Sequence, residues 1–120
     1  SQIRDYLQSS MTNSDTYPLK RVKIEVSNGN GVRHMARQVG HFLKDRKVVM
    51  MYLSNADHFN YQGTRIYYTR GTLNEAYRLS QKLPGRQQMQ EVDEIRKGNA
   101  DIRVRIGKDL VPHLDAFKES

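Results

Sequence analysis

Polar side chains that could bind a ligand follow two predicted strands. Asn28 comes directly after the alternating run 22–26, and Asn55 follows the apolar run 48–53. If these two strands are parallel and adjacent, both asparagines lie at the carboxyl ends of the strands, where open sheets collect ligands. Their amides could then bind the hydroxyl or amide groups of a sugar. The candidate binding residues at this edge are Asn28, Gly29, Asn30, Gly31, Arg33, Asn55, Asp57 and Tyr61.

A structural role for the same residues stays open. Asparagine at a strand end commonly bonds nearby backbone and so caps a turn. Gly29 and Gly31 would then serve positive φ angles or a close approach of the backbone. Alternatively, the amides from Gly31 to Arg33 open a helix and could hold a phosphate or carboxylate, with Arg33 as an anion partner. The motif Asn-Gly-Asn-Gly does not decide between these roles, because it is shorter than a dinucleotide fingerprint and lacks the lysine and hydroxyl of a phosphate loop.

The residue pattern does not indicate an enzyme. Asp57 and His58 are the one adjacent carboxylate and imidazole, but they stand in a polar segment typical of a solvated turn. His34 and His41 are two helical turns apart, about 10 Å, which is too far for one metal ion. The chain has no cysteine and no Ser-His-Asp order or HExxH helix. We therefore expect no catalytic residues, no metal and no cofactor.

The periodicity predicts five strands and two helices. Strands are expected at 22–26, 48–53, 65–69 and 102–106, with a weaker one at 89–92. The run 48–53 is apolar at consecutive positions, which favours a strand covered on both sides or lying at a contact. An amphipathic helix follows Gly31 and ends near Leu43. A second helix has a capping box at Thr72 and Glu75 and ends at Pro84-Gly85.

This order of elements indicates an α+β two-layer sandwich: a mixed four- to five-stranded sheet with two helices on one face, in the order β-α-β-β-α-β-β. The other face would show Lys23, Glu25, Arg103 and Arg105, with Tyr67 or Tyr68 depending on register. Residues 1–19 read as a linker or the end of a preceding region, residues 20–110 as the domain, and residues 111–120 as a C-terminal tail. A chain that starts at Ser1 is expected to be an excised domain or a processed product.

The net charge of the chain bears on which class of partner it could bind. A formal net charge of +7 favours acidic partners, but the basic residues are dispersed rather than grouped in blocks, as on an ordinary solvated surface. RNA binding on the open sheet face is the alternative function, because Lys23, Arg65, Tyr67, Arg103 and Arg105 could form a basic stacking platform. The aromatic signature of such a platform is missing, so nucleic acid is not the expected partner. No apolar run approaches the roughly 20 residues that a membrane-spanning helix needs.

Several short segments, taken in order, resemble one family. They are 26–33 (VSNGNGVR), 36–39 (ARQV), 54–57 (SNAD), Tyr61 ahead of 66–68 (IYY), and 101–110 (DIRVRIGKDL). This pattern is similar to the LytR C-terminal domain, a module found behind the catalytic domain of LytR-CpsA-Psr cell-wall glycopolymer transferases and behind tetratricopeptide repeats. The resemblance implies a non-catalytic accessory binding or interaction domain of a bacterial cell-envelope protein, extracytoplasmic in typical members.

The resemblance leaves the partner open. It implies cell-wall glycan or an envelope protein, and no oligomeric state follows from it. A protein partner is suggested by Met50, Met51 and Tyr52, which would leave apolar surface to cover if their strand lies at an edge of the sheet.

Overall fold

The computed structural model describes residues 21–118, so the predicted linker at 1–19 lies outside the described residues. The strands are β2 (Val22–Asn28), β3 (Val48–Asn55), β4 (Arg65–Thr69), β5 (Gln88–Val92) and β6 (Ile102–Ile106). The α-helices are α1 (Met35–Leu43), α2 (Leu73–Lys82) and α3 (Leu114–Lys118), and the short 3-10 helices are η1 (Lys97–Asn99) and η2 (Lys108–His113). All five predicted strands are therefore present, and β4 and β6 have the predicted bounds.

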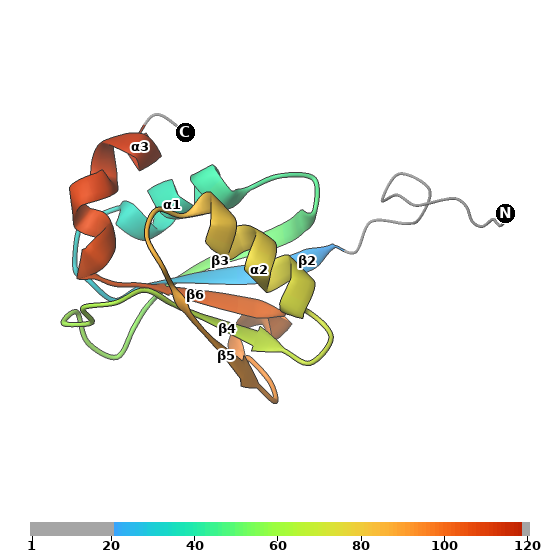
Figure 1. Cartoon of the computed structure of the whole chain (residues 1–120). Coiled ribbons are helices and arrows are strands. Elements are labelled where there is room, and N and C mark those ends of the chain that lie inside the picture. The colour runs from blue at the N-terminus through green and yellow to red at the C-terminus, as the bar shows by residue number, and fades with distance from the viewer. Residues whose placement is uncertain (1–20, 119–120) are drawn as a thin grey trace, which may run out of the picture.

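The strands form one mixed sheet in the order β3-β2-β6-β4-β5. The central strand β2 is parallel to both β3 and β6, while β4 runs antiparallel to β6 and parallel to β5. The three α-helices lie together over one face of the sheet, as Figure 1 shows. The predicted α+β two-layer sandwich is confirmed.

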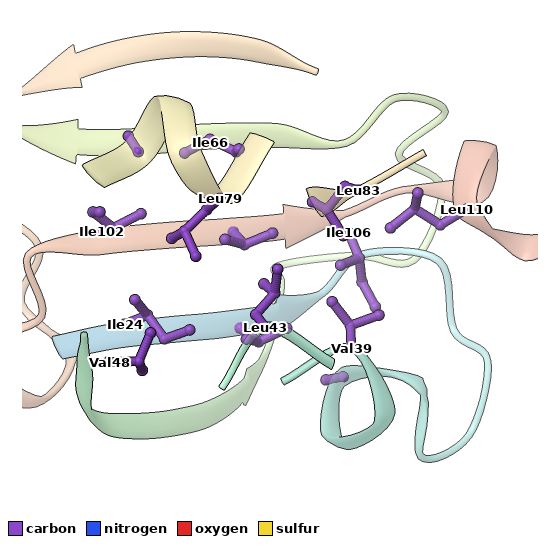
Figure 2. Close-up of a cluster of buried hydrophobic side chains, with 14 of the residues drawn as sticks. Ile24, Val39, Leu43, Val48, Ile66, Leu79, Leu83, Ile102, Ile106 and Leu110 are labelled. Carbon is purple, nitrogen blue, oxygen red and sulfur yellow. The ribbon is translucent and has the colours of Figure 1, made fainter. Parts of the chain in front are cut away.

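The core lies between this sheet face and the helices. Alternate residues of β2, Val22, Ile24 and Val26, are almost fully buried, and the same alternation on β6 buries Ile102, Val104 and Ile106. Helix α1 adds Val39 and Leu43, and α2 adds Leu79, with Leu83 directly after it (Figure 2). Period-two patterns on the strands and a 3.6-residue stripe on the helices thus bury one face of each element.

Strand β3 differs from one of the two predictions made for it. It is an edge strand, and among its side chains Val49, Met50 and Leu53 have exposed fractions of 50%, 49% and 43%. The expectation that it is covered on both sides is wrong within the described residues. Consecutive apolar residues predict a strand but do not tell its place in the sheet, since that depends on pairing with distant segments.

The start of α2 also differs from prediction. The Thr72 hydroxyl donates to the Thr69 carbonyl (2.7 Å) and makes no side-chain bond to the helix amides. The predicted capping box is therefore absent, although the helix begins at that place, because the Ala76 amide donates to the Thr72 carbonyl (2.9 Å). The hydroxyl satisfies the turn that leaves β4 instead.

The C-terminal residues join the helical layer. Helix α3 packs against α1, and Phe117 is 1% exposed. Its ring meets that of Phe42 edge to face, with 5.1 Å between centroids. From the sequence we expected a C-terminal tail at residues 111–120, because the apolar residues Val111, Leu114 and Phe117 are too few to predict a helix.

Asp45 ties the end of α1 to α2 through a polar cluster. Arg78 Nη1 and Lys82 Nζ donate to its carboxylate at 2.6 and 2.5 Å. Burial alone would raise the pKa of Asp45, but the hydrogen bonds from Arg78 and Lys82 outweigh it and hold the pKa well below its usual range. The cluster therefore stabilises the fold only while the carboxylate is ionised.

Asp45→Asn is expected to lower the free energy of unfolding at pH 7 by about 1–2 kcal/mol, as for a partly buried ion-pair cluster. Because the folded pKa is depressed, this contribution is complete above the unfolded value of about 3.9 and is lost as the pH falls below it. Urea unfolding of wild type and variant between pH 2 and 7 measures the difference, with Asp93→Asn at an exposed site as the control. A difference that stays constant over this range would contradict the prediction.

Candidate functional site

The turn after β2 is held by the Asn28 side chain. Its Oδ1 accepts from the amides of Asn30 (3.1 Å) and Gly31 (3.0 Å), and its Nδ2 donates to the Val32 carbonyl (3.0 Å). Asn28 is 8% exposed. All these bonds lie within five residues of chain, so the asparagine caps the turn.

Asn30 also has a structural place. Its Nδ2 donates to the Gly107 carbonyl (2.8 Å) and its Oδ1 accepts from the Val32 amide (2.9 Å), which joins the turn to the end of β6. The two asparagine oxygens therefore occupy the amides of Gly31 and Val32, two of the groups expected for an anion. Gly31 has φ +80°, the left-handed conformation that favours glycine. Arg33 is exposed at the start of the helix.

Gly29 allows a close approach of three segments. Its amide donates to the Ile106 carbonyl (2.9 Å), and its carbonyl accepts from the Tyr61 amide (3.0 Å). A Cβ at this position would lie 2.7 Å from the Ile106 oxygen and 2.9 Å from the Tyr61 ring. The glycine thus lets the loop 56–64 lie against the sheet and fixes the position of Tyr61.

Asn28 and Asn55 are direct partners in the parallel pair β2–β3, as the edge hypothesis required. Asn55 is exposed, and its side chain makes no hydrogen bond with residues 21–118. It lines two hollows. The rim hollow, of about 270 Å³, is lined by Asn28, His34, Ala36, Arg37, Leu53, Ser54 and Asn55.

The second hollow opens on the sheet face away from the helices and is here called the open-face hollow. Its volume is about 250 Å³. Its lining residues come from β2, the end of β3, the segment after β3, β4 and β6: Glu25, Ser27, Asn55, Ala56, Asp57, Tyr61, Tyr67, Arg103 and Arg105. Strand residues one position from the core residues point to the opposite face, which explains why Glu25, Arg103 and Arg105 meet there.

Tyr61 forms one wall of the open-face hollow. The Arg105 guanidinium carbon lies 3.6 Å from the centre of its ring, and the His58 ring stacks on it with 4.1 Å between centroids. Two groups this close to one ring centre cover opposite faces of the ring. The Tyr61 hydroxyl donates to Asp57 Oδ1 (2.5 Å), and this bond lowers the pKa of Asp57 and raises that of Tyr61.

Glu25 is a buried carboxylate, 3% exposed, at the floor of the open-face hollow. Arg103 Nε donates to its Oε1 (2.8 Å) and Ser54 Oγ donates to its Oε2 (2.5 Å). Both carboxylate oxygens therefore have a partner, as a buried charge requires. Arg103 and Ser54 occupy both carboxylate oxygens of Glu25, so neither oxygen is free to act as a base.

Two other groups of the open-face hollow have unused hydrogen-bonding capacity. Arg105 Nη1 donates to the Tyr67 hydroxyl (2.7 Å), but Arg105 Nε is buried without an acceptor among the described residues. Ser27 is 4% exposed, and its hydroxyl makes no hydrogen bond within residues 21–118. Buried polar groups in proteins nearly always have a partner, and Arg105 Nε is an exception among the described residues, together with Gln38 Oε1 and Arg78 Nε.

The structure divides the residues chosen from the sequence. Asn55, Asp57 and Tyr61 line the open-face hollow, whereas Asn28, Gly29, Asn30 and Gly31 build the turn behind it. Arg33 lines neither hollow. Six other residues that line the open-face hollow were not among the candidates chosen from the sequence: Glu25, Ser27, Ala56, Tyr67, Arg103 and Arg105. Their signal was the strand alternation, which had already placed Glu25, Arg103 and Arg105 on the open face.

The histidines make no constellation of ligands. His58 Nδ1 accepts from the Asn60 amide (3.1 Å), while Asp57 takes the Tyr61 hydroxyl, so the two adjacent side chains have different partners. His34 and His41 are both exposed. Within residues 21–118 no group of three metal-ligating side chains occurs. Over the same range no helix is long and apolar enough to cross a membrane.

Comparison with known proteins adds a family and a fold. A family model described as "LytR cell envelope-related transcriptional attenuator" matches residues 21–110. The solution structure of the C-terminal domain of RV0431 is similar, with a TM-score of 0.52 and 17% identity, over 89% of this chain and 88% of that one. At this identity the likeness concerns the fold alone. Among curated proteins no match to the sequence is found.

Proposed function

This chain belongs to the LytR cell envelope-related family, whose model spans nearly all of its sheet and helical layer, and from that premise we propose that it is a binding module for cell-wall glycan. The family makes it an accessory domain associated with the cell envelope. The proposed site is the open-face hollow, and the proposed location is outside the cytoplasmic membrane.

The observation that carries the proposal is the set of unused polar groups in one hollow. Asn55, Ser27 and Arg105 line the same 250 Å³ space; no side-chain hydrogen bond of Asn55 or Ser27 is found among the described residues, and Arg105 Nε is buried without an acceptor there. Small-molecule sites usually occupy roughly 300–1,000 Å³, so this hollow suits about one sugar unit of a polymer. Hydroxyl-rich ligands need donors and acceptors in fixed positions, and the rigid sheet supplies them.

The same geometry supports binding rather than catalysis. A general base needs a free carboxylate or imidazole within reach of the substrate. Glu25 is engaged by Arg103 and Ser54, and Asp57 by the Tyr61 hydroxyl. The polar groups that remain are suited to hold a ligand rather than to transfer its protons.

Co-sedimentation with purified bacterial cell walls tests the proposal. Asn55→Ala is expected to weaken retention about three- to tenfold, because one or two hydrogen bonds to the glycan are lost. Asn74→Ala, at an exposed asparagine of α2, is the matched control and is expected to bind as wild type does. No retention of the wild-type domain, or equal retention of Asn55→Ala and wild type, would contradict the proposal.

A protein partner is a second candidate function, and one observation favours it. The edge strand β3 exposes Val49, Met50 and Leu53, and His41 of α1 and Lys44 directly after it border one hollow together with Val49 and Met50. An exposed apolar edge strand is a known place for another strand to add. This surface lies away from the open-face hollow, so the two candidate functions involve different residues.

Nucleic acid is a weaker candidate on the same open face. Stacking platforms need aromatic rings with a free face. Both faces of the Tyr61 ring are covered, by Arg105 and His58, and the Tyr67 hydroxyl is bonded to Arg105. The cations are present, but the ring nearest to them is already stacked.

A further inference from the structure

We propose that the open-face hollow selects a carboxylated sugar, whose carboxylate docks on Arg105 while its hydroxyls meet Ser27 and Asn55. This inference rests on the proposed function and names the chemical class of glycan that the hollow takes. The hollow has a volume of about 250 Å³, so the proposed ligand is one sugar unit of a polymer.

The position of Arg105 is fixed from two directions. Its guanidinium lies over the Tyr61 ring at 3.6 Å, and its Nη1 donates to the Tyr67 hydroxyl at 2.7 Å. A guanidinium held by an aromatic face below and a hydroxyl at one nitrogen keeps a single orientation. Little conformational entropy is then lost when a ligand binds to it.

One edge of this guanidinium is unused. Nε has no acceptor, and Nη2 donates no hydrogen bond within the described residues. Nε and Nη2 form the edge that pairs with the two oxygens of a carboxylate through parallel hydrogen bonds. A buried N–H without an acceptor destabilises the empty domain, and a ligand oxygen that reaches Nε would remove that cost.

Charge supports an anionic ligand at this place. Glu25 is matched by Arg103 and Ser54, and Asp57 accepts from Tyr61. No carboxylate of residues 21–118 lies within ion-pair distance of Arg105. Arg105 is therefore the cation of the hollow without an ion-pair partner, although the Asp57 carboxylate, bonded by the neutral Tyr61 hydroxyl, also lines the hollow.

The neighbouring groups favour a sugar acid over a simple anion. Ser27 and Asn55 offer a hydroxyl and an amide that a free carboxylate or phosphate would leave unpaired. A planar carboxylate also matches the flat edge of a guanidinium better than one oxygen of a tetrahedral group does. A hydroxyl-bearing ring with one carboxylate satisfies all three groups together.

The test is calorimetric titration with trigalacturonate and with its fully methyl-esterified form, which keeps the ring and loses the charge. Wild type is expected to bind the acid at least about tenfold more tightly than the ester, the ratio that one charge-assisted bidentate contact provides. Arg105→Gln is expected to abolish this preference. Arg105→Lys keeps the charge without the edge and is expected to retain only part of it.

Arg65→Gln is the matched control, because Arg65 lies on the same sheet face and bonds Gln88 and Gln90 outside the open-face hollow. It is expected to leave the preference unchanged. Equal binding of acid and ester would overturn the inference while leaving glycan binding intact, and so would the absence of binding to either form by a domain that sediments with cell walls. Tetraglutamate or millimolar phosphate that competes as well as trigalacturonate would also overturn it.

Discussion

Phe117→Ala is expected to lower the free energy of unfolding by about 3–4 kcal/mol, within the range for removing a buried aromatic ring. Phe117 is 1% exposed and packs edge to face on Phe42 of α1, so its loss leaves a cavity between α3 and α1. Urea denaturation followed by circular dichroism measures the change. The expected loss is large because α3 is short and has few other anchors in the core.

Val111→Ala is the matched control for this prediction, since Val111 precedes α3 and is 37% exposed. It is expected to change the free energy of unfolding by less than about 0.5 kcal/mol. A loss below about 1 kcal/mol for Phe117→Ala would mean that residues 111–118 form a tail after all.

Asn28→Ala is expected to reduce stability and Asn55→Ala to reduce cell-wall binding, although the two residues are partners in adjacent strands. Asn28→Ala removes three hydrogen bonds of a buried side chain and is expected to lower the free energy of unfolding by about 2–3 kcal/mol. Asn55→Ala removes an exposed side chain without such bonds and is expected to change it by less than about 0.5 kcal/mol.

Urea denaturation and cell-wall retention, measured on both variants, separate the roles of the two residues. At a temperature low enough for the Asn28→Ala domain to be folded, its retention on cell walls is expected to be close to that of wild type. Retention of Asn55→Ala is expected to be weaker. If Asn28→Ala is as stable as wild type but fails to bind, the turn-capping role derived for Asn28 is incorrect.

Much of the fold was predictable because its elements repeat one local rule. Alternation along 22–26 and 102–106 placed Ile24 and Val104 in the core and Glu25 and Arg103 on the open face, and the register then selected Tyr67 rather than Tyr68 for that face. The edge position of β3 was not predictable. It results from pairing between segments far apart in the chain, and local composition does not predict that pairing.

The site was predictable in part. Parallel pairing of the first two strands brings Asn28 and Asn55 together, as their places at strand ends suggested. Residue type alone could not show that the Asn28 side chain bonds the backbone of its own turn, while the Asn55 side chain makes no such bond. The role of Arg105 could not be predicted for the same reason. A charged strand residue is usually solvent-exposed, and only the structure shows that Tyr61, from a loop some forty residues away, stacks on it.

The most direct test of glycan binding at the open-face hollow is a nuclear magnetic resonance titration of the ¹⁵N-labelled domain with soluble cell-wall oligosaccharides. Glycan binding there is expected to change the chemical shifts of Ser27, Asn55, Tyr61, Arg103 and Arg105 and to leave Val49, Met50 and Leu53 at the β3 edge unchanged. Changes confined to Val49, Met50 and Leu53, or no changes at saturating oligosaccharide, would contradict it.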